Sequence, residues 1–124
     1  MSAKSADAGG GFGPLEAEVM DAVWAAETPV SVREVMGRLN ERRAEPLAYT
    51  TVMTVMGRLA EKGALGRRPV GRGYAYEATA TNQAGLAVQS VIRTYGDEAM
   101  AHFVEQARAD PDLLRRMEQL LKEE

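Results

Sequence analysis

The sequence predicts a mainly α-helical fold with one small β-hairpin, in which a winged helix-turn-helix domain precedes a short helical domain. Three observations predict it. Residues 14–62 contain three short segments with helical apolar spacing, two strand-like runs surround Gly71-Arg72-Gly73, and helical spacing returns beyond Thr79. Three helices followed by a hairpin is the order of a winged helix.

The first helix is predicted from Pro14 to about Ala26. Proline is tolerated at the first helical position, and the segment Glu27-Thr28-Pro29 breaks the pattern. Trp24 lies between positions of the apolar stripe, so we interpret it as a core anchor. The stripe itself consists of Leu15, Val19, Ala22, Val23 and Ala26.

A second helix is predicted to begin after Ser31 and to end near Arg43. Ser31 with Glu34 three residues later is the pattern of a capping box, in which each side chain accepts a hydrogen bond from the other residue's backbone N–H. Its apolar face carries Val32, Val35, Met36 and Leu39.

The third helix, about Tyr49 to Lys62, ends where Gly63 can adopt a left-handed conformation. At about 100° per residue its two faces separate. The apolar side carries Val52, Met53, Val55, Met56, Leu59 and Ala60, and the other side carries Thr50, Thr51, Thr54, Gly57, Arg58 and Glu61. Threonine is a poor helix former, but its hydroxyl and methyl groups suit base edges and phosphates. The third helix is therefore interpreted as a recognition helix, against the alternative of an ordinary solvated face.

The predicted hairpin comprises Leu65–Val70 and Tyr74–Ala78, with Arg72 at its tip. Pro69 cannot donate a hydrogen bond, so it belongs on an outward-facing edge. Arg72, together with Arg67 and Arg68, suits contact with phosphates or the minor groove. The alternative is that these arginines only protect an exposed edge strand.

Helical spacing beyond residue 80 predicts three more short amphipathic helices, the last capped by Asp110 before Pro111. They carry too few large residues for a stable core of their own, so we expect them to pair with a second copy. The expected dimerisation residues are Val88, Val91, Ile92, Tyr95, Phe103, Leu113, Leu114, Met117, Leu120 and Leu121.

The predicted boundaries are a flexible tail over residues 1–12, a winged helix domain over 13–80 and a helical dimerisation domain over 81–124. Residues 1–12 lack the apolar segment of a signal peptide. The longest uncharged stretch, 78–92, is too short and too polar to span a bilayer. We therefore expect a cytoplasmic protein without membrane insertion.

Charge is distributed unevenly around a net value of −3. Residues 28–76 carry nine basic and four acidic side chains, whereas residues 81–124 carry five basic and eight acidic ones. A basic module beside an acidic one is typical of a DNA-binding domain with a separate assembly domain.

The residue types argue against an enzyme. The chain has no cysteine and a single histidine, His102, and no pair of carboxylates lies in a pocket-forming motif. Gly71 and Gly73 join two strands and do not open a helix, so they do not form a phosphate loop. We expect no catalytic residues, no metal and no cofactor.

Three segments together resemble the penicillinase-repressor (BlaI/MecI) family: LEAEVMDAVW, AYTTVMTVMGRLAEKG and GRGYAYEA. The resemblance covers about residues 15–78 well and the remainder in outline. It implies a homodimeric winged-helix repressor that binds a palindromic operator before resistance or stress genes, with Thr51 and Thr54 of the third helix in the major groove and Thr50 and Arg58 on the same face.

In the antibiotic-responsive branch of that family, a membrane sensor protease triggers cleavage of the C-terminal domain, commonly at an Asn-Phe pair. The corresponding pair here is His102-Phe103, which departs from that pattern. The copper-responsive branch uses clustered cysteines, which this chain lacks. The alternative function is a winged-helix module that binds another protein, because fold alone does not fix function.

Overall fold

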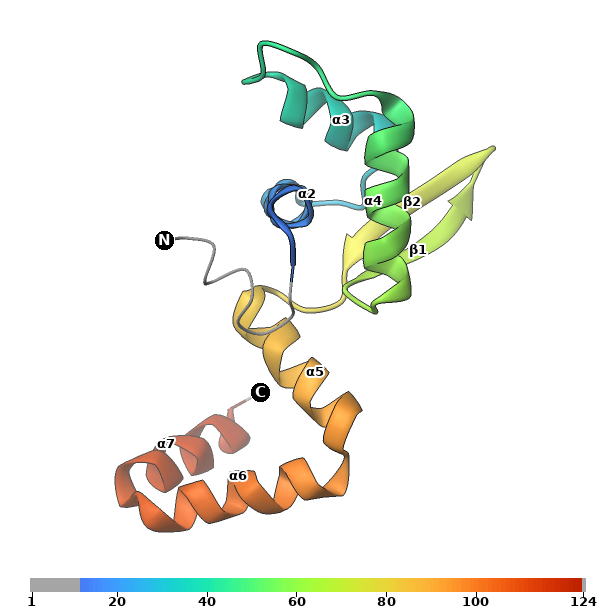
Figure 1. Ribbon diagram of the computed structural model, residues 1–124. Coiled ribbons are helices and arrows are strands. Elements are labelled where there is room, and N and C mark those ends of the chain that lie inside the picture. Colours follow the sequence, from blue (N-terminus) through green and yellow to red (C-terminus); the bar gives the residue numbers. More distant parts are fainter. Residues whose placement is uncertain (1–11, 124) are drawn as a thin grey trace. The chain divides into compact units, whose positions relative to one another are not determined.

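Residues 12–123 are described by a computed structural model, and they form six helices and one two-stranded antiparallel sheet (Figure 1). The elements are α2 (Pro14–Ala25), α3 (Val32–Asn40), α4 (Tyr49–Glu61), β1 (Leu65–Val70), β2 (Gly73–Ala78), α5 (Gln83–Tyr95), α6 (Asp97–Ala109) and α7 (Pro111–Lys122). This confirms the predicted mainly α fold with a hairpin after three helices. The chain divides into two compact units, Met1–Ala87 and Val88–Glu124.

The predicted tail, residues 1–12, lies outside the described residues except for Phe12. Phe12 is buried at 4% exposure among the residues of the core, and the Nζ of Lys62 lies 5.5 Å from its ring centroid. An aromatic ring gains more from burial than a polar tail residue would. Phe12 therefore packs with the folded domain.

The start of α3 and the end of α4 are formed as predicted. The Oγ of Ser31 accepts from Glu34 N at 3.1 Å, and Oε1 of Glu34 accepts from Ser31 N at 2.8 Å, which confirms the capping box. Gly63 follows α4 with φ of 85°, a conformation that glycine adopts without a steric penalty.

Helix α3 ends earlier than predicted, at Asn40 and not near Arg43. The Asn40 amide explains the early end, because it bonds the backbone of the next loop. Its Nδ2 donates to Leu47 O at 3.2 Å, and its Oδ1 accepts from Leu47 N at 2.8 Å. This paired contact competes with continued helix and fixes the connection that leads into α4.

One hydrophobic core holds α2, α3, α4 and the hairpin together. Its largest fully buried side chains are Tyr76, Met20, Met56, Leu59, Val19 and Val52. Trp24 lies against this core, and its Nε1 donates to Ala80 O at 2.9 Å. Trp24 is thus a core anchor, as the sequence indicated.

The hairpin pairs Leu65 with Ala78 at its base and Val70 with Gly73 at its tip. Its base is tied to the α2–α3 connection, since Val30 and Tyr76 exchange backbone hydrogen bonds of 2.9 and 2.8 Å. This bridge gives β2 a second neighbour that the sequence did not predict. The wing is therefore anchored at one end and free at the other.

In the second unit, α6 and α7 contact each other, and Ala99 and Ala107 are the buried hydrophobic residues of α6. The side-chain carboxylate of Asp110 accepts from Asp112 N and Leu113 N, which confirms the predicted cap of α7. Helix α7 buries none of its residues. Within residues 12–123, no helix combines the length and the apolar character that crossing a membrane requires.

Candidate nucleic-acid interface

Helix α4 presents one face to the core and the opposite face to solvent. Val52, Val55, Met56 and Leu59 are buried. All four predicted contact residues of this helix, Thr50, Thr51, Thr54 and Arg58, are exposed. The threonines therefore lie together on a surface to which an extended ligand has access. Hydroxyl, methyl and guanidinium groups on one helix face match the groups presented by the major groove.

Met53 corrects the predicted division of that helix. Helical periodicity predicts Met53 on the apolar side, but the residue is 42% exposed. Its angular position is at the edge of the buried stripe, where burial depends on whether a neighbouring element covers it. Tyr49, at the start of α4, is likewise 40% exposed.

Arg33 extends this surface beyond α4 and was not predicted as a site residue. It lies in the first turn of α3, and its Cζ is 5.3 Å from the ring centroid of Tyr49. A guanidinium at this distance is attracted to the negative face of the ring. The contact holds a positive charge beside the start of α4. Arg33 and Tyr49 are 16 positions apart in the sequence, so local sequence patterns do not predict their contact.

The predicted strand arginines lie on opposite faces of the hairpin. Arg67 pairs with Tyr76 and Arg68 with Ala75, and adjacent strand residues point to opposite sides. The Cζ of Arg67 lies 4.6 Å from the ring centroid of Tyr74. A hydrogen bond with the Tyr76 side chain, together with the charge of both tyrosines and of Glu61, raises the pKa of Arg67 despite some desolvation. Arg67 is therefore held by wing aromatics, and the two arginines do not act as one pair.

Arg72 occupies the free end of the wing. It is exposed between Gly71 and Gly73, and Gly71 has φ of 60°, which closes the tight turn. The hairpin lies beside α4, which contacts β1 (Figure 1). The positive charge at the wing tip and the exposed threonine face of α4 thus belong to the same unit.

Glu16 fixes the end of α4 against α2. Its carboxylate accepts from Lys62 Nζ at 2.8 Å and from Gly13 N at 3.0 Å. Burial raises the pKa of Glu16, but the hydrogen bonds from Lys62 and Gly13 and the charges of Lys62 and Arg58 outweigh it, so the net pKa is lowered. The ionised carboxylate therefore favours the observed position of α4.

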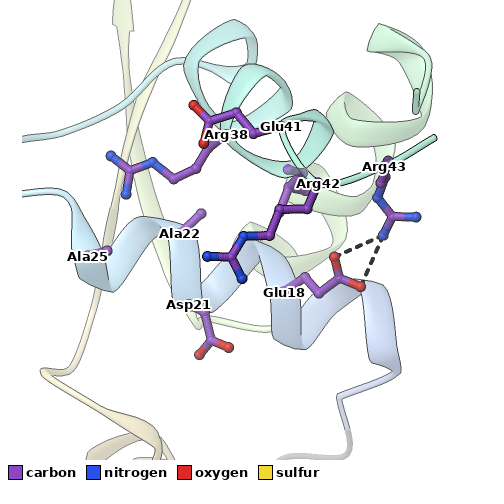
Figure 2. A pocket seen from close by; sticks show the side chains of 9 residues that line it. Glu18, Asp21, Ala22, Ala25, Arg38, Glu41, Arg42 and Arg43 are labelled. Atoms are coloured by element: carbon purple, nitrogen blue, oxygen red, sulfur yellow. Dashed lines mark hydrogen bonds and ion pairs between the residues drawn. The ribbon is translucent and has the colours of Figure 1, made fainter. Parts of the chain in front are cut away.

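A second charged surface is a groove between α2 and α3 (Figure 2). Arg43 crosses it to Glu18, with Nη2 to Oε1 at 2.8 Å. The charged lining residues are Glu18, Asp21, Arg38, Glu41, Arg42 and Arg43. Because three are basic and three acidic, the groove has no net charge and does not fit a polyanion.

The predicted dimerisation residues all lie in the second unit, which begins at Val88. Phe103 and Leu113 are half-buried, and the other eight are exposed. The most exposed are Leu121 at 84%, Leu120 at 64% and Tyr95 at 60%. Clustered exposed aliphatic and aromatic side chains are typical of an interface.

His102 and Phe103 lie in the middle of α6. The Nδ1 of His102 is 2.9 Å from Oε1 of Glu105, and Phe103 is half-buried. Both residues line a small pocket with Val91, Tyr95, Glu98 and Ala99. The described residues contain no group of three or more histidine, cysteine or acidic side chains placed to hold a metal ion.

Comparison with known proteins gives concordant matches. The model of a family described as the penicillinase repressor matches residues 12–123. Two proteins from different strains of Mycobacterium tuberculosis, both described as transcriptional regulator BlaI, are each 39% identical to the chain over 113 residues. Each match covers 85% of this chain and 80% of the relative.

Proposed function

The chain belongs to the penicillinase repressor family of transcriptional regulators, and we propose that it binds a palindromic operator as a homodimer and represses transcription from the adjoining promoter. The regulated genes would be of the β-lactamase, resistance or stress-response type. A chromosomal target places the protein in the cytoplasm, and the proposal assigns it no enzymatic step.

The observation that carries this proposal is the exposed face of α4. Thr50, Thr51, Thr54 and Arg58 project from a helix whose other face is buried in the core. The threonines would contact base edges in the major groove, and Arg58 would contact phosphate or guanine. Arg72 at the wing tip would reach the adjoining backbone or minor groove.

The proposed dimer follows from the exposed apolar side chains of the second unit. Helix α7 has no buried residue, although Leu114, Met117, Leu120 and Leu121 all lie on it. Covering such side chains contributes roughly 25 cal/mol for each Å² removed from water. A second copy offers the same surface about a two-fold axis, and it would place two α4 helices on one operator.

Repression would follow from occupancy, because a dimer over promoter DNA excludes polymerase. Release would follow from loss of the dimer, since the second subunit binds through a high effective concentration. Proteolysis between His102 and Phe103, set off indirectly by a membrane sensor protease, is the proposed trigger. That bond lies inside α6, so this turn must open before a protease can cut it.

The test is an anisotropy titration of the protein on DNA from upstream of its own gene, with a scrambled duplex for comparison. We expect Thr54→Ala to lower the affinity for the preferred duplex by roughly fivefold or more. The ratio of the affinities for the preferred and scrambled duplexes should fall as well. Arg72→Ala should lower the affinity for both duplexes by the same factor and make binding less sensitive to salt. Equal affinity of the wild type for both duplexes would contradict the proposed operator binding.

A protein-binding module is the second candidate, and the mixed-charge groove between α2 and α3 favours it. This groove carries Arg38 and Arg42 beside Asp21, a pattern that suits a partner with alternating charges. It predicts that Thr54→Ala and Arg72→Ala leave every DNA affinity unchanged while Arg38→Glu abolishes a protein complex.

A further inference from the structure

Gly57 occupies the middle of α4 for no reason that lies within the domain. A Cβ built on Gly57 meets no atom within 4 Å, and its φ is not positive. Glycine in a helix interior is less favourable than alanine, because its backbone loses more conformational freedom on folding. The fold would therefore be more stable with alanine at position 57. This indicates that a binding partner outside the chain requires this position to have no side chain.

Met53 lies one helical turn before Gly57 and is equally unexplained by packing. Residues four apart lie one above the other on a helix surface, so the two positions adjoin. Within α4, which is described in full, Met53 and Tyr49 are the large hydrophobic residues that remain exposed. Tyr49 has a contact with Arg33, whereas Met53 offers its flexible thioether to solvent.

The charges around these positions point to nucleic acid as the occupant. Arg58 directly follows Gly57, and Arg33 lies against Tyr49 one turn before Met53. Glu61, one turn after Gly57, is the one acidic residue of α4, so the two arginines leave an excess of positive charge around an apolar centre. This suits a polyanion that has one apolar group on its accessible surface. In the major groove of DNA that group is the 5-methyl of thymine, since the other base edges there present hydrogen-bonding atoms.

We propose that Met53 and Gly57 together form a thymine-reading site of this protein. The absent side chain at Gly57 lets the α4 backbone approach a base pair closely, and Met53 packs on the methyl group of the thymine. This inference rests on the proposed operator binding and deepens it, because it assigns a specificity role to two residues outside the predicted contact set.

Gly57→Ala tests the close approach, with Gly37→Ala as the matched control. Gly37 also lies inside a helix, α3, and a Cβ there meets no atom within 4 Å. Both variants should raise the melting temperature by a similar amount, because alanine favours helix. We expect Gly57→Ala to weaken binding to the preferred upstream duplex by roughly tenfold, and Gly37→Ala to leave it unchanged.

Deoxyuridine tests the methyl contact, since it removes only the 5-methyl group of thymine. Each thymine of the preferred duplex is replaced in turn, and affinities are measured for the wild type, Met53→Gln and Met53→Leu. At one position in each half-site, the replacement should lower the DNA affinity of the wild type and of Met53→Leu about threefold or more. The affinity of Met53→Gln should not change. Gln keeps the length and helix propensity of Met but replaces the thioether with a polar amide, and Met53→Leu keeps an apolar side chain as the matched control.

The outcomes separate this inference from the function on which it rests. If the wild type prefers no duplex over a scrambled one, operator binding and the thymine site both fail. If the wild type is selective but Gly57→Ala binds as tightly as Gly37→Ala, the close approach is wrong. If every deoxyuridine replacement lowers the DNA affinity of Met53→Gln as much as that of the wild type, the proposed contact between Met53 and the thymine methyl group is wrong.

Discussion

Glu16 and Lys62 join the start of α2 to the residue that follows α4, so this pair helps to set the angle of α4. The Glu16 side chain is 12% exposed and the Lys62 side chain 41%. Lys62 also lies over the ring of Phe12, which places its charge between a carboxylate and an aromatic face. A half-buried ion pair of this kind restricts geometry more than it adds stability.

The lowered pKa of Glu16 predicts a specific pH dependence. The group loses its proton more readily in the folded state, so its stabilising contribution is complete above its ordinary pKa of 4.5 and is lost as the pH falls through the folded value. Glu16→Gln should therefore lower the free energy of unfolding at neutral pH by up to about 1 kcal/mol. The measurement is urea unfolding between pH 3 and 7.

The control for that prediction is Glu18→Gln, because Glu18 makes its ion pair with Arg43 across the groove and not with the end of α4. A difference between wild type and Glu16→Gln that stays constant from pH 7 to pH 3 would show that the carboxylate charge is not responsible.

Helix caps and turn residues could be predicted from the sequence, because they act on neighbouring residues. Whether a side chain is covered by an element distant in the sequence could not be predicted. Ser31, Glu34, Gly63 and Asp110 act within a few residues of themselves, so the sequence indicated their roles correctly. The exposure of Met53 depended instead on whether another element covers the edge of α4, and among residues 12–123 none covers it fully.

At the scale of elements, the wing is the least supported part of the first unit. A two-stranded hairpin is at best marginally stable by itself. Its base is held by buried Tyr76 and the bridge to Val30, whereas Arg72 at the tip is exposed. Between these ends, Arg67 lies over Tyr74, whose ring meets that of Tyr76 edge to face at a centroid distance of 6.2 Å. This stack stiffens the middle of the hairpin.

Arg67→Ala should loosen the wing, and Arg68→Ala should not, because Arg68 lies on the other face of the sheet. We expect backbone amides around Tyr74 to exchange with deuterium several-fold faster in Arg67→Ala, since this variant loses the cation–π contact with the Tyr74 ring. Hydrogen exchange followed by mass spectrometry measures this. Equal protection in the two variants would mean that Arg67 acts only through its charge.

The order and type of elements followed from periodicity and turn residues, but their mutual contacts did not. The bridge between Val30 and Tyr76 and the hydrogen bond from Trp24 to Ala80 join residues far apart in the sequence. Such pairings depend on how helices pack and leave no local pattern. The early end of α3 has the same cause, since it depends on Asn40 reaching Leu47.

At the scale of the whole molecule, the chain combines a well-packed unit with one that is incompletely covered. Met20, Met56 and Leu59 are fully buried in the first unit, whereas Leu120 and Leu121 of the second are largely exposed. Our account is that a second copy covers these residues and that operator affinity depends on this pairing.

Footprinting of the upstream duplex with hydroxyl radicals tests that account most directly, using wild type and Met117→Glu in parallel with sedimentation. Met117 lies on α7, remote in sequence from α4 and the wing, and a charge there would oppose burial of the apolar face. We predict two protected half-sites whose centres lie about one helical turn, or a multiple of it, apart for the wild type. Met117→Glu should sediment as a monomer and protect neither half-site at the same concentration. Two protected half-sites formed by a monomeric Met117→Glu would contradict the account.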